Sequence, residues 1–410
     1  MHLLITVNPA TDDSKKNRLT TYLNSMRIIL LIAAVLIFAR CARNNNQYDI
    51  QSSTKSDLQA IDLNKALEQT VYKQSDIIDS IKKIVFLETN DSSLIHPPIL
   101  KIEVTDERIY ISDIYQSMGL IIFDQNGKFI KRLPQGNGPG EIACMINFTF
   151  DKFANQLIVY GNPFVYLFDE DGNYIDVKIA DFSADHILAT ADEYLFSKIP
   201  GHANPQFEGC DNNSIIVTDK NLNIKHMMCP YASNRGVSLR MGHIGDAAYI
   251  SVPDGDTVYY YGNHDFMAKY AFDFSEHKVI PVEPTDPAEI IAYYSKPIEG
   301  FVFNANYLET EHHQVMNFSK GRYGYSLFRN KDNGHTIGGI NCSRNFEEEI
   351  IMGSGETTWY NQFVSWNLPQ SYAKGSLQSD KYVSVADRQK LDALDAEDNP
   401  FLVFYTLKDF

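Results

Sequence analysis

The sequence predicts an all-β protein, a six-bladed β-propeller with four-stranded blades. From residue 81 onward, short strand-like stretches separated by turn residues recur along the 410-residue chain. The same hairpin turn recurs with Gly127 and Gly172 in equivalent positions, and repeats of about 40 to 50 residues with four short strands each are typical of propeller blades. The segments near Val85 and Val403 are expected to pair and close the ring, which removes exposed sheet edges.

Composition indicates a folded, acidic body. Hydrophobic residues make up 44% of the chain, with 24 Tyr and 24 Phe, which is ample for a core. The formal net charge is −16 at pH 7, and nucleic acids are bound through a clustered basic face, so we expect no nucleic-acid partner. The same charge disfavours docking of the folded body on anionic lipid, so any membrane attachment is expected at the N-terminus.

The N-terminal region has the layout of an export signal. From Met26, one Arg precedes an apolar run at residues 28–39, and an Asn-rich segment follows. The run is shorter than the roughly 20 residues of a spanning helix, so residues 26–41 are interpreted as a signal peptide, with a transmembrane helix as the alternative. Residues 1–25 carry mixed charges and precede the expected start at Met26, so they are interpreted as an artefact of the assigned start codon or a disordered lead.

Cys41 is the expected site of lipidation. It follows Ala39 and Arg40 in a context that resembles the lipobox of bacterial lipoproteins, although a small residue is usual where Arg40 stands. Ordinary secretory cleavage nearby is the alternative. We expect a lipid-anchored protein of the cell envelope, at the outer membrane or facing the periplasm, and a secreted protein if Cys41 is not acylated. Residues 42–57 are predicted to be a flexible tether and residues 58–410 the propeller domain.

The first elements of the folded part follow from spacing and turns. Residues 58–80 have loosely helical spacing, and residues 81–89 alternate like a strand. Four strands of the first blade follow at residues 101–104, 108–112, 119–124 and 128–133. The Asn126-Gly127 pair between the last two predicts a hairpin, because both central turn positions favour positive φ.

Five further units repeat this arrangement. They lie at residues 148–179, at 186–200 with 213–227, at 240–274, at 302–339, and at 363–367 with 381–387 and 401–410. Residues 282–300 are predicted to be a loop or small helix over one face, and residues 386–400 a short helix that leads to the closing strand. A pair of β-sandwiches is the alternative fold, but it leaves the repeated hairpin register unexplained.

The segment GNGPGEI between the first two blades carries a resemblance. Gly136, Gly138, Pro139, Gly140 and Glu141 resemble the crossover of NHL-like six-bladed propellers. Over residues 81–410 the layout resembles the six-bladed β-propeller lipoproteins of Bacteroidales, many of which belong to families of unknown function. The resemblance implies the fold and an envelope location. It implies no established reaction, because NHL-like relatives range from binding scaffolds to lyases and hydrolases.

The residue types at this crossover are explained first by the backbone conformation that the chain needs there. Gly138 and Gly140 permit positive φ and Pro139 fixes a bend, so the chain can leave an outer strand and enter the next blade near the axis. Glu141 is then expected beside the central mouth, where a carboxylate could also hold a cation or a sugar hydroxyl. Five further residues are candidates for lining the central funnel: Arg235, Arg240, His243, Tyr259 and Tyr323.

No catalytic or metal motif is evident. Histidines 186, 202, 226, 243, 264, 312 and 313 fall in different units, and their spacing does not indicate convergence. Asp124, Asp169 and Asp171 stand in turns, where aspartate caps backbone amides. We therefore expect no cofactor and no metal, and a binding or scaffold protein for a glycan, a peptide or an envelope protein. The alternative is an NHL-like lyase or hydrolase with a metal at the axis.

Overall fold

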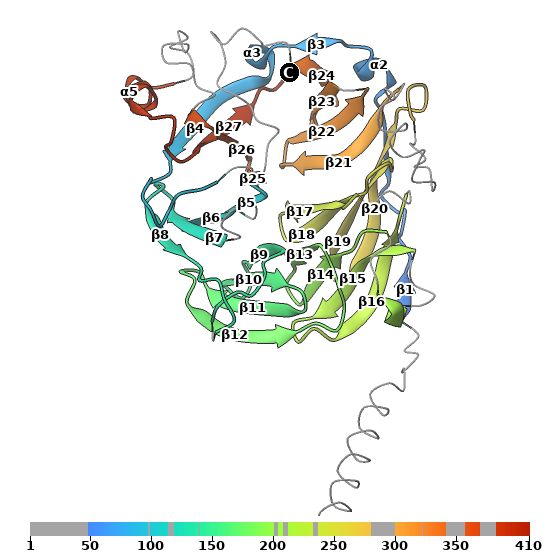
Figure 1. Cartoon of the computed structure of the whole chain (residues 1–410). Helices are drawn as coiled ribbons and strands as arrows, with labels where there is room; N and C mark the ends of the chain where they lie inside the picture. Colours follow the sequence, from blue (N-terminus) through green and yellow to red (C-terminus); the bar gives the residue numbers. More distant parts are fainter. Residues whose placement is uncertain are drawn as a thin grey trace, which may run out of the picture. The chain divides into compact units, whose positions relative to one another are not determined.

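Six β-sheets surround a central axis, which confirms the predicted six-bladed propeller (Figure 1). The computed structural model describes residues 48–96, 99–113, 119–138, 140–200, 204–207, 212–232, 237–279, 300–321, 323–341, 357–369 and 383–410. The predicted signal peptide with Cys41, and nearly all of the predicted loop at residues 282–300, lie outside these ranges. None of the helices within them is both long and apolar enough to span a membrane.

The first three blades contain the strands expected from the repeats. Blade 1 is β5 (Lys101–Val104), β6 (Arg108–Asp113), β7 (Gly119–Asp124) and β8 (Phe129–Arg132). Blade 2 is β9 (Asn147–Asp151), β10 (Gln156–Gly161), β11 (Phe164–Asp169) and β12 (Tyr174–Ile179). Blade 3 is β13 (His186–Ala189), β14 (Glu193–Ser197), β15 (Asn213–Asp219) and β16 (Ile224–Pro230).

The second half of the ring is built in the same way. Blade 4 is β17 (Arg240–Ile244), β18 (Ala247–Ser251), β19 (Thr257–Gly262) and β20 (Asp265–Asp273). Blade 5 is β21 (Val302–Glu309), β22 (His313–Lys320), β23 (Tyr323–Asn330) and β24 (Thr336–Asn341). Blade 6 is β25 (Thr357–Trp359), β26 (Gln362–Asn367), β27 (Phe401–Leu407) and β4 (Ile78–Phe86).

The two ends of the propeller domain meet in blade 6, as predicted. β27 and β4 are antiparallel neighbours, with Leu402 opposite Val85. Both side chains are buried in a cluster that also contains Ile121 and Phe123 of blade 1. Five other clusters fill the spaces between successive blades. Burial of these apolar side chains between blades is the main favourable contribution to the ring.

One recurring turn aligns the third and fourth strands of blades 1, 2 and 3. The carboxylates of Asp124, Asp169 and Asp219 each accept hydrogen bonds from the backbone amides two and four residues later, at 2.8 to 3.0 Å. Gly127 and Gly172 occupy the left-handed position with φ 84° and 75°. Aspartate and glycine thus play the turn roles that their types predict.

The N-terminal part of the described chain follows the outside of the ring, which the sequence did not predict. β1 (Asp49–Gln51), β2 (Gln59–Asp62) and β3 (Val71–Tyr72) add a parallel fifth strand to β16, β20 and β24 in turn. The predicted helical region is limited to α2 (Asn64–Leu67) and α3 (Gln74–Ile77). Part of the expected tether at residues 42–57 is therefore a strand, and we call residues 49–77 the strap.

A second correction concerns blade 6. Residues 381–387 were expected to be one of its strands, but α5 (Val385–Ala393) begins there, and β25 is the first strand instead. Ser384 caps α5, because its Oγ accepts a hydrogen bond from the Asp387 amide at 3.0 Å. That cap explains why an alternating segment forms a helix. The helix predicted within residues 386–400 is confirmed.

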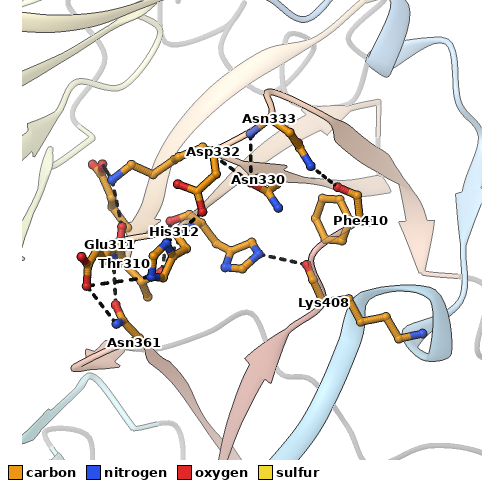
Figure 2. Close-up of polar contacts among 12 residues, drawn as sticks. Thr310, Glu311, His312, Asn330, Asp332, Asn333, Asn361, Lys408 and Phe410 are labelled. Carbon is orange, nitrogen blue, oxygen red and sulfur yellow. Dashed lines mark hydrogen bonds and ion pairs between the residues drawn. The ribbon is translucent and has the colours of Figure 1, made fainter.

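The C-terminal tail packs against blade 5 beside the ring closure (Figure 2). Asn333 Nδ2 donates to the Phe410 carbonyl at 2.8 Å, and His313 Nε2 lies 3.0 Å from the Lys408 carbonyl oxygen. In the same region the Glu311 amide donates to Asn361 Oδ1 at 3.1 Å, which joins blades 5 and 6. The tail and this contact therefore link blade 5 to blade 6.

Candidate functional site: the central cavity

A cavity of about 1020 Å³ lies where the first strands of all six blades converge. These strands are β5, β9, β13, β17, β21 and β25, and Figure 1 shows them innermost in the ring. A propeller brings residues that are remote in sequence to its axis in this way. The cavity has the size of a small-molecule binding site.

Blades 1 and 2 contribute a fixed ammonium group to the cavity wall. Lys101 Nζ lies 2.7 Å from Glu103 Oε1 and donates to the Phe148 carbonyl at 2.5 Å. It also lies 3.4 Å from Asn147 Oδ1. Asn147 is buried at the start of β9. These contacts hold a positive charge and an amide at defined positions near the axis.

Blade 5 contributes a bulge. Between Phe303 and Tyr307, β21 has three residues where β22 has one, and Ala305 in the middle adopts φ 58°. Bulges redirect side chains and are common beside binding sites. Here the bulge directs Asn306 towards blade 4, where its Oδ1 accepts a hydrogen bond from Arg240 Nη1. Asn304 is exposed and exchanges hydrogen bonds with Ser319 Oγ.

Two histidines of blades 3 and 4 line the same cavity. Burial, followed by the positive charges of Lys101 and Arg240, lowers the pKa of His186 to about 4. Burial and then Lys152 lower the pKa of His243 to about 4. Both imidazoles are therefore neutral at pH 7 and can donate and accept hydrogen bonds. Neither ring nitrogen of His243 has a hydrogen-bond partner among the described residues.

Turns at one end of the first strands are tied to one another across the ring. Lys152 Nζ of blade 2 donates to the Gly245 carbonyl of blade 4 at 2.8 Å and lies 2.8 Å from Asp246 Oδ1. The Tyr360 hydroxyl of blade 6 donates a hydrogen bond to Asp106 Oδ1 of blade 1 at 2.7 Å. The Tyr360 ring lies 5.0 Å from that of Trp359, and both line the cavity. An aromatic pair thus stands beside the polar wall.

The structure brings some of the predicted funnel residues together and separates others. Arg240 and His243 line the cavity. Tyr259 does not, because it lies on the third strand of blade 4 and stacks on Phe266 at 4.9 Å. Tyr323 is an exposed residue at the start of β23 and is also outside the lining. Arg235 lies outside the described residues.

The crossover residues form a self-contained loop. Glu141 Oε2 accepts a hydrogen bond from the Gly138 amide at 2.8 Å, and a Cβ at Gly136 would lie 2.0 Å from that same oxygen. Gly140 has φ 77° and packs against Tyr174. Glu141 does not line the central cavity, contrary to expectation. Its carboxylate is turned into its own loop, while Pro139 lies outside the described residues.

Several residues of the site were missed in the sequence. Asn147, Asn304, Asn306 and Trp359 were not candidates, and His186 was considered only as one of seven scattered histidines. Their place in the repeat could have identified them, because each of these residues belongs to the first strand of its blade, which lies next to the axis. The bulge that places Asn304 and Asn306 in the cavity lining has no comparable signal.

The described part of the chain contains no group of three or more His, Cys, Asp or Glu side chains placed to share a metal ion. His226 and His264, for example, lie on blades 3 and 4 away from the cavity lining. The cavity wall instead carries amide, guanidinium, ammonium and neutral imidazole groups beside aromatic rings, together with the carboxylates of Glu103, Asp106, Glu107, Glu170 and Glu309. Such a wall, with both donors and acceptors, is suited to hydrogen bonding with a polar ligand that carries hydroxyl groups.

Comparison with known proteins gives the family. The model of the domain of unknown function DUF4934 matches residues 58–406. The chain belongs to the DUF4934 family. A Bacteroides fragilis protein described as exported shares the fold, with a TM-score of 0.65 and 16% identity over 86% of this chain and 100% of its own. A DUF4221 protein from Bacteroides vulgatus has a TM-score of 0.51 and 9% identity over 81% of this chain and 98% of its own.

Curated proteins offer no further guidance, because none of them matches the chain. The similarity to the two solved structures concerns the fold alone at these identities. For this DUF4934 propeller, any function must therefore be argued from the cavity itself.

Proposed function

We propose that this DUF4934 protein is an exported, lipid-anchored propeller that binds an oligosaccharide in its central cavity. One observation carries the proposal. Asn147, Asn306, Arg240 and His243 come from three of the six blades to one cavity of about 1020 Å³, and Trp359 comes from a fourth. Side chains of these types bind the hydroxyl groups and the apolar ring faces of sugars.

The polar groups of the wall are arranged in advance of binding. Arg240 is oriented by Asn306, and Lys101 by Glu103 and the Phe148 carbonyl. Groups that are already fixed lose little rotamer freedom when a ligand binds, which favours affinity. Trp359 can supply a flat apolar surface against which a sugar ring packs.

The cellular location rests on the N-terminal sequence and on similarity. Residues 26–41 have the layout of a signal peptide, and Cys41 stands at the expected point of acylation. A Bacteroides fragilis protein of the same fold is described as exported. The mass of the mature N-terminal peptide from membranes would decide the point: a diacyl or triacyl Cys41 is expected, and an unmodified peptide would rule out the anchor.

A binding screen tests the ligand class. We expect calorimetry against a panel of neutral and acidic oligosaccharides to give binding, and Asn306→Ala to weaken it about tenfold, as the loss of one well-placed hydrogen bond would. Trp359→Ala should weaken it by a similar factor. Tyr323→Ala is the matched control, because Tyr323 is exposed and lies outside the cavity lining.

Three outcomes would overturn the proposal: no oligosaccharide binds, peptides of a parallel panel bind instead, or binding is insensitive to Asn306→Ala and Trp359→Ala. The alternative of an axial metal enzyme would need ligands from several blades within coordination distance, and the described residues contain no such cluster.

A further inference from the structure

The outer edges of the six blades differ in what covers them. The strap pairs with the outer strands of blades 3, 4 and 5. In blade 1, the Phe129 amide of β8 donates to Glu88 Oε2 at 2.9 Å, and Arg132 Nε donates to the Ser92 carbonyl at 2.9 Å. In blade 6, β4 exposes Asp79 and Lys82. Covering strands and charges of these kinds prevent unwanted pairing at a sheet edge.

Blade 2 is one of three blades without a fifth strand, and among these three it has the most exposed apolar side chains on its outer strand. Its outer strand β12 has no second neighbour among the described residues, since β11 is its partner in the sheet. Tyr174, Ile175, Val177 and Ile179 of β12 are 42%, 47%, 38% and 69% exposed. Four exposed large apolar side chains on one open edge strand are the feature that other blades avoid, and such an edge is a template for pairing with another strand.

The backbone of β12 is available for pairing. The Val177 amide donates to Asp176 Oδ1, within its own strand, at 2.8 Å. This local contact can be exchanged for a bond to a neighbouring strand without unfolding any element. The chain itself provides the precedent, because β1, β2 and β3 each pair with the outer strand of another blade.

The sequence of β12 is complementary to itself in the antiparallel direction. With Val177 opposite Val177 of a second copy, Ile175 stands opposite Ile179, and Asp176 stands opposite Lys178. Each of these pairs occurs twice because of the two-fold symmetry. Apolar pairs and opposite-charge pairs across antiparallel strands are both stabilising, whereas like charges directly opposite are destabilising.

We propose that β12 is a homodimer interface, in which the edge strands of two copies pair antiparallel about Val177. The charged residues of β12 favour a second copy of the chain as the partner in this register. The chain carries −16 overall, so two copies repel at long range, and the two Asp176–Lys178 pairs provide local attraction in this arrangement. Within one copy, Lys178 Nζ donates to the Lys220 carbonyl at 2.6 Å, so in the pair this ammonium group would share its hydrogen bonds between that carbonyl and Asp176 of the second copy.

The dimer is independent of the ligand proposed for the central cavity. A strand pair of six residues buries less surface than a standard interface, so the association is expected to be weak and to depend on concentration. Anchored molecules on one membrane meet at a higher local concentration than molecules in solution, which favours a weak pair.

Sedimentation equilibrium of the full-length chain in detergent, over a range of protein concentrations, tests the proposal. We expect a monomer–dimer equilibrium, and Val177→Lys should abolish the dimer because it places two ammonium groups at the two-fold axis. Tyr323→Lys is the control, since Tyr323 is also solvent-exposed, on blade 5. Unchanged circular dichroism spectra and melting temperatures would show that both variants are folded.

Charge reversal tests the register. Asp176→Lys places like charges opposite each other twice, and the dimer should dissociate about tenfold more readily. The double variant Asp176→Lys with Lys178→Asp restores both opposite-charge pairs and should recover the wild-type equilibrium. A chain that stays monomeric, a dimer that survives Val177→Lys, or a double variant that fails to recover would each overturn the proposal.

Discussion

Gly127 sits at the joint between the first and the last blade. Its φ is 84°, and a Cβ built on it would lie 2.2 Å from the Phe86 carbonyl oxygen of β4. The Gly127 carbonyl also accepts a hydrogen bond from the Glu88 amide at 2.8 Å. A turn glycine of blade 1 is therefore a contact point for the strand that closes the ring.

Gly127→Ala is expected to lower the free energy of unfolding by more than about 2 kcal/mol. Roughly 1 kcal/mol comes from the left-handed backbone, and the remainder from displacing β4. Gly245→Ala is the matched control, because Gly245 also has positive φ, at 56°, but a Cβ added there would meet nothing within 4 Å. It should lose only the backbone contribution. If urea unfolding gave the same loss of unfolding free energy for both variants, the steric explanation would be contradicted.

The neutral histidines of the cavity predict how stability depends on pH. His186 and His243 have pKa values lowered from 6.5 to about 4 in the folded protein. Between these values the unfolded chain binds more protons than the folded one, so the free energy of unfolding falls as pH drops from about 6.5 to about 4. The stabilising contribution of the neutral form is fully present above pH 6.5.

Urea unfolding at several pH values checks this dependence. The double variant His186→Gln with His243→Gln should lose less stability between pH 6.5 and pH 4.5 than the wild type does. His312→Gln is the control, because His312 is an exposed residue that lies 2.9 Å from Asp332, outside the cavity. The prediction fails if the double variant and the wild type have the same slope in this range.

Individual site residues were predictable only where type and position agreed. Arg240 and His243 were expected at the funnel and line the cavity. Tyr259 and Tyr323 were chosen by residue type, but both lie on the third strand of their blade, which does not reach the axis. Asn306 owes its place to a bulge at Ala305, and an unfavourable backbone angle at an alanine leaves no trace in a sequence.

At the level of elements, the long strands were predictable and the short ones were not. The four strands of blade 1 and the closing pair β4 and β27 are four to nine residues long, rich in apolar residues and bounded by turn residues. β3 has only two residues, too few for a period to be read. Its stability comes from pairing with β24, a contact of long sequence separation.

The strap also explains why its residues were interpreted as a helix. Leu63 and Leu67 are buried between blades 4 and 5, and Ile77 is buried between blades 5 and 6. A segment that follows the outside of the ring must place an apolar side chain into each space between blades. That requirement produces widely spaced apolar residues, which resemble the spacing of one long helix although only Asn64–Leu67 and Gln74–Ile77 of the strap are helical.

In the whole molecule, the strap and the ring closure are separable. β4 is an integral strand of blade 6, whereas β1, β2 and β3 are additions to blades that already hold four strands. A propeller needs a contact such as that of β4 to close, since an open ring exposes the faces of two blades. The added strands β1, β2 and β3 contribute stability and cover three sheet edges.

Chains with two new starting points distinguish these roles. A chain that begins at Gln74 keeps α3 and β4 but lacks β1, β2, β3 and α2. It loses buried side chains such as Leu63, each contributing about 2 kcal/mol, and it exposes the edge of β20. We expect a lower melting temperature and more aggregation than in a chain that begins at Tyr48, with unfolding still cooperative.

A chain that begins at Thr89 also lacks β4, and we expect it to lose ring closure and not only stability. Val85 and Leu402 are opposite each other in the closing pair and are 2% and 0% exposed, so removing β4 uncovers β27 and the adjoining face of blade 1. Blade 6 should then be cleaved rapidly by protease, and cooperative unfolding should be lost. If the chains from Gln74 and from Thr89 instead unfolded alike, β4 would be no more than another strand of the strap, and closure of the ring would depend on contacts between blades alone.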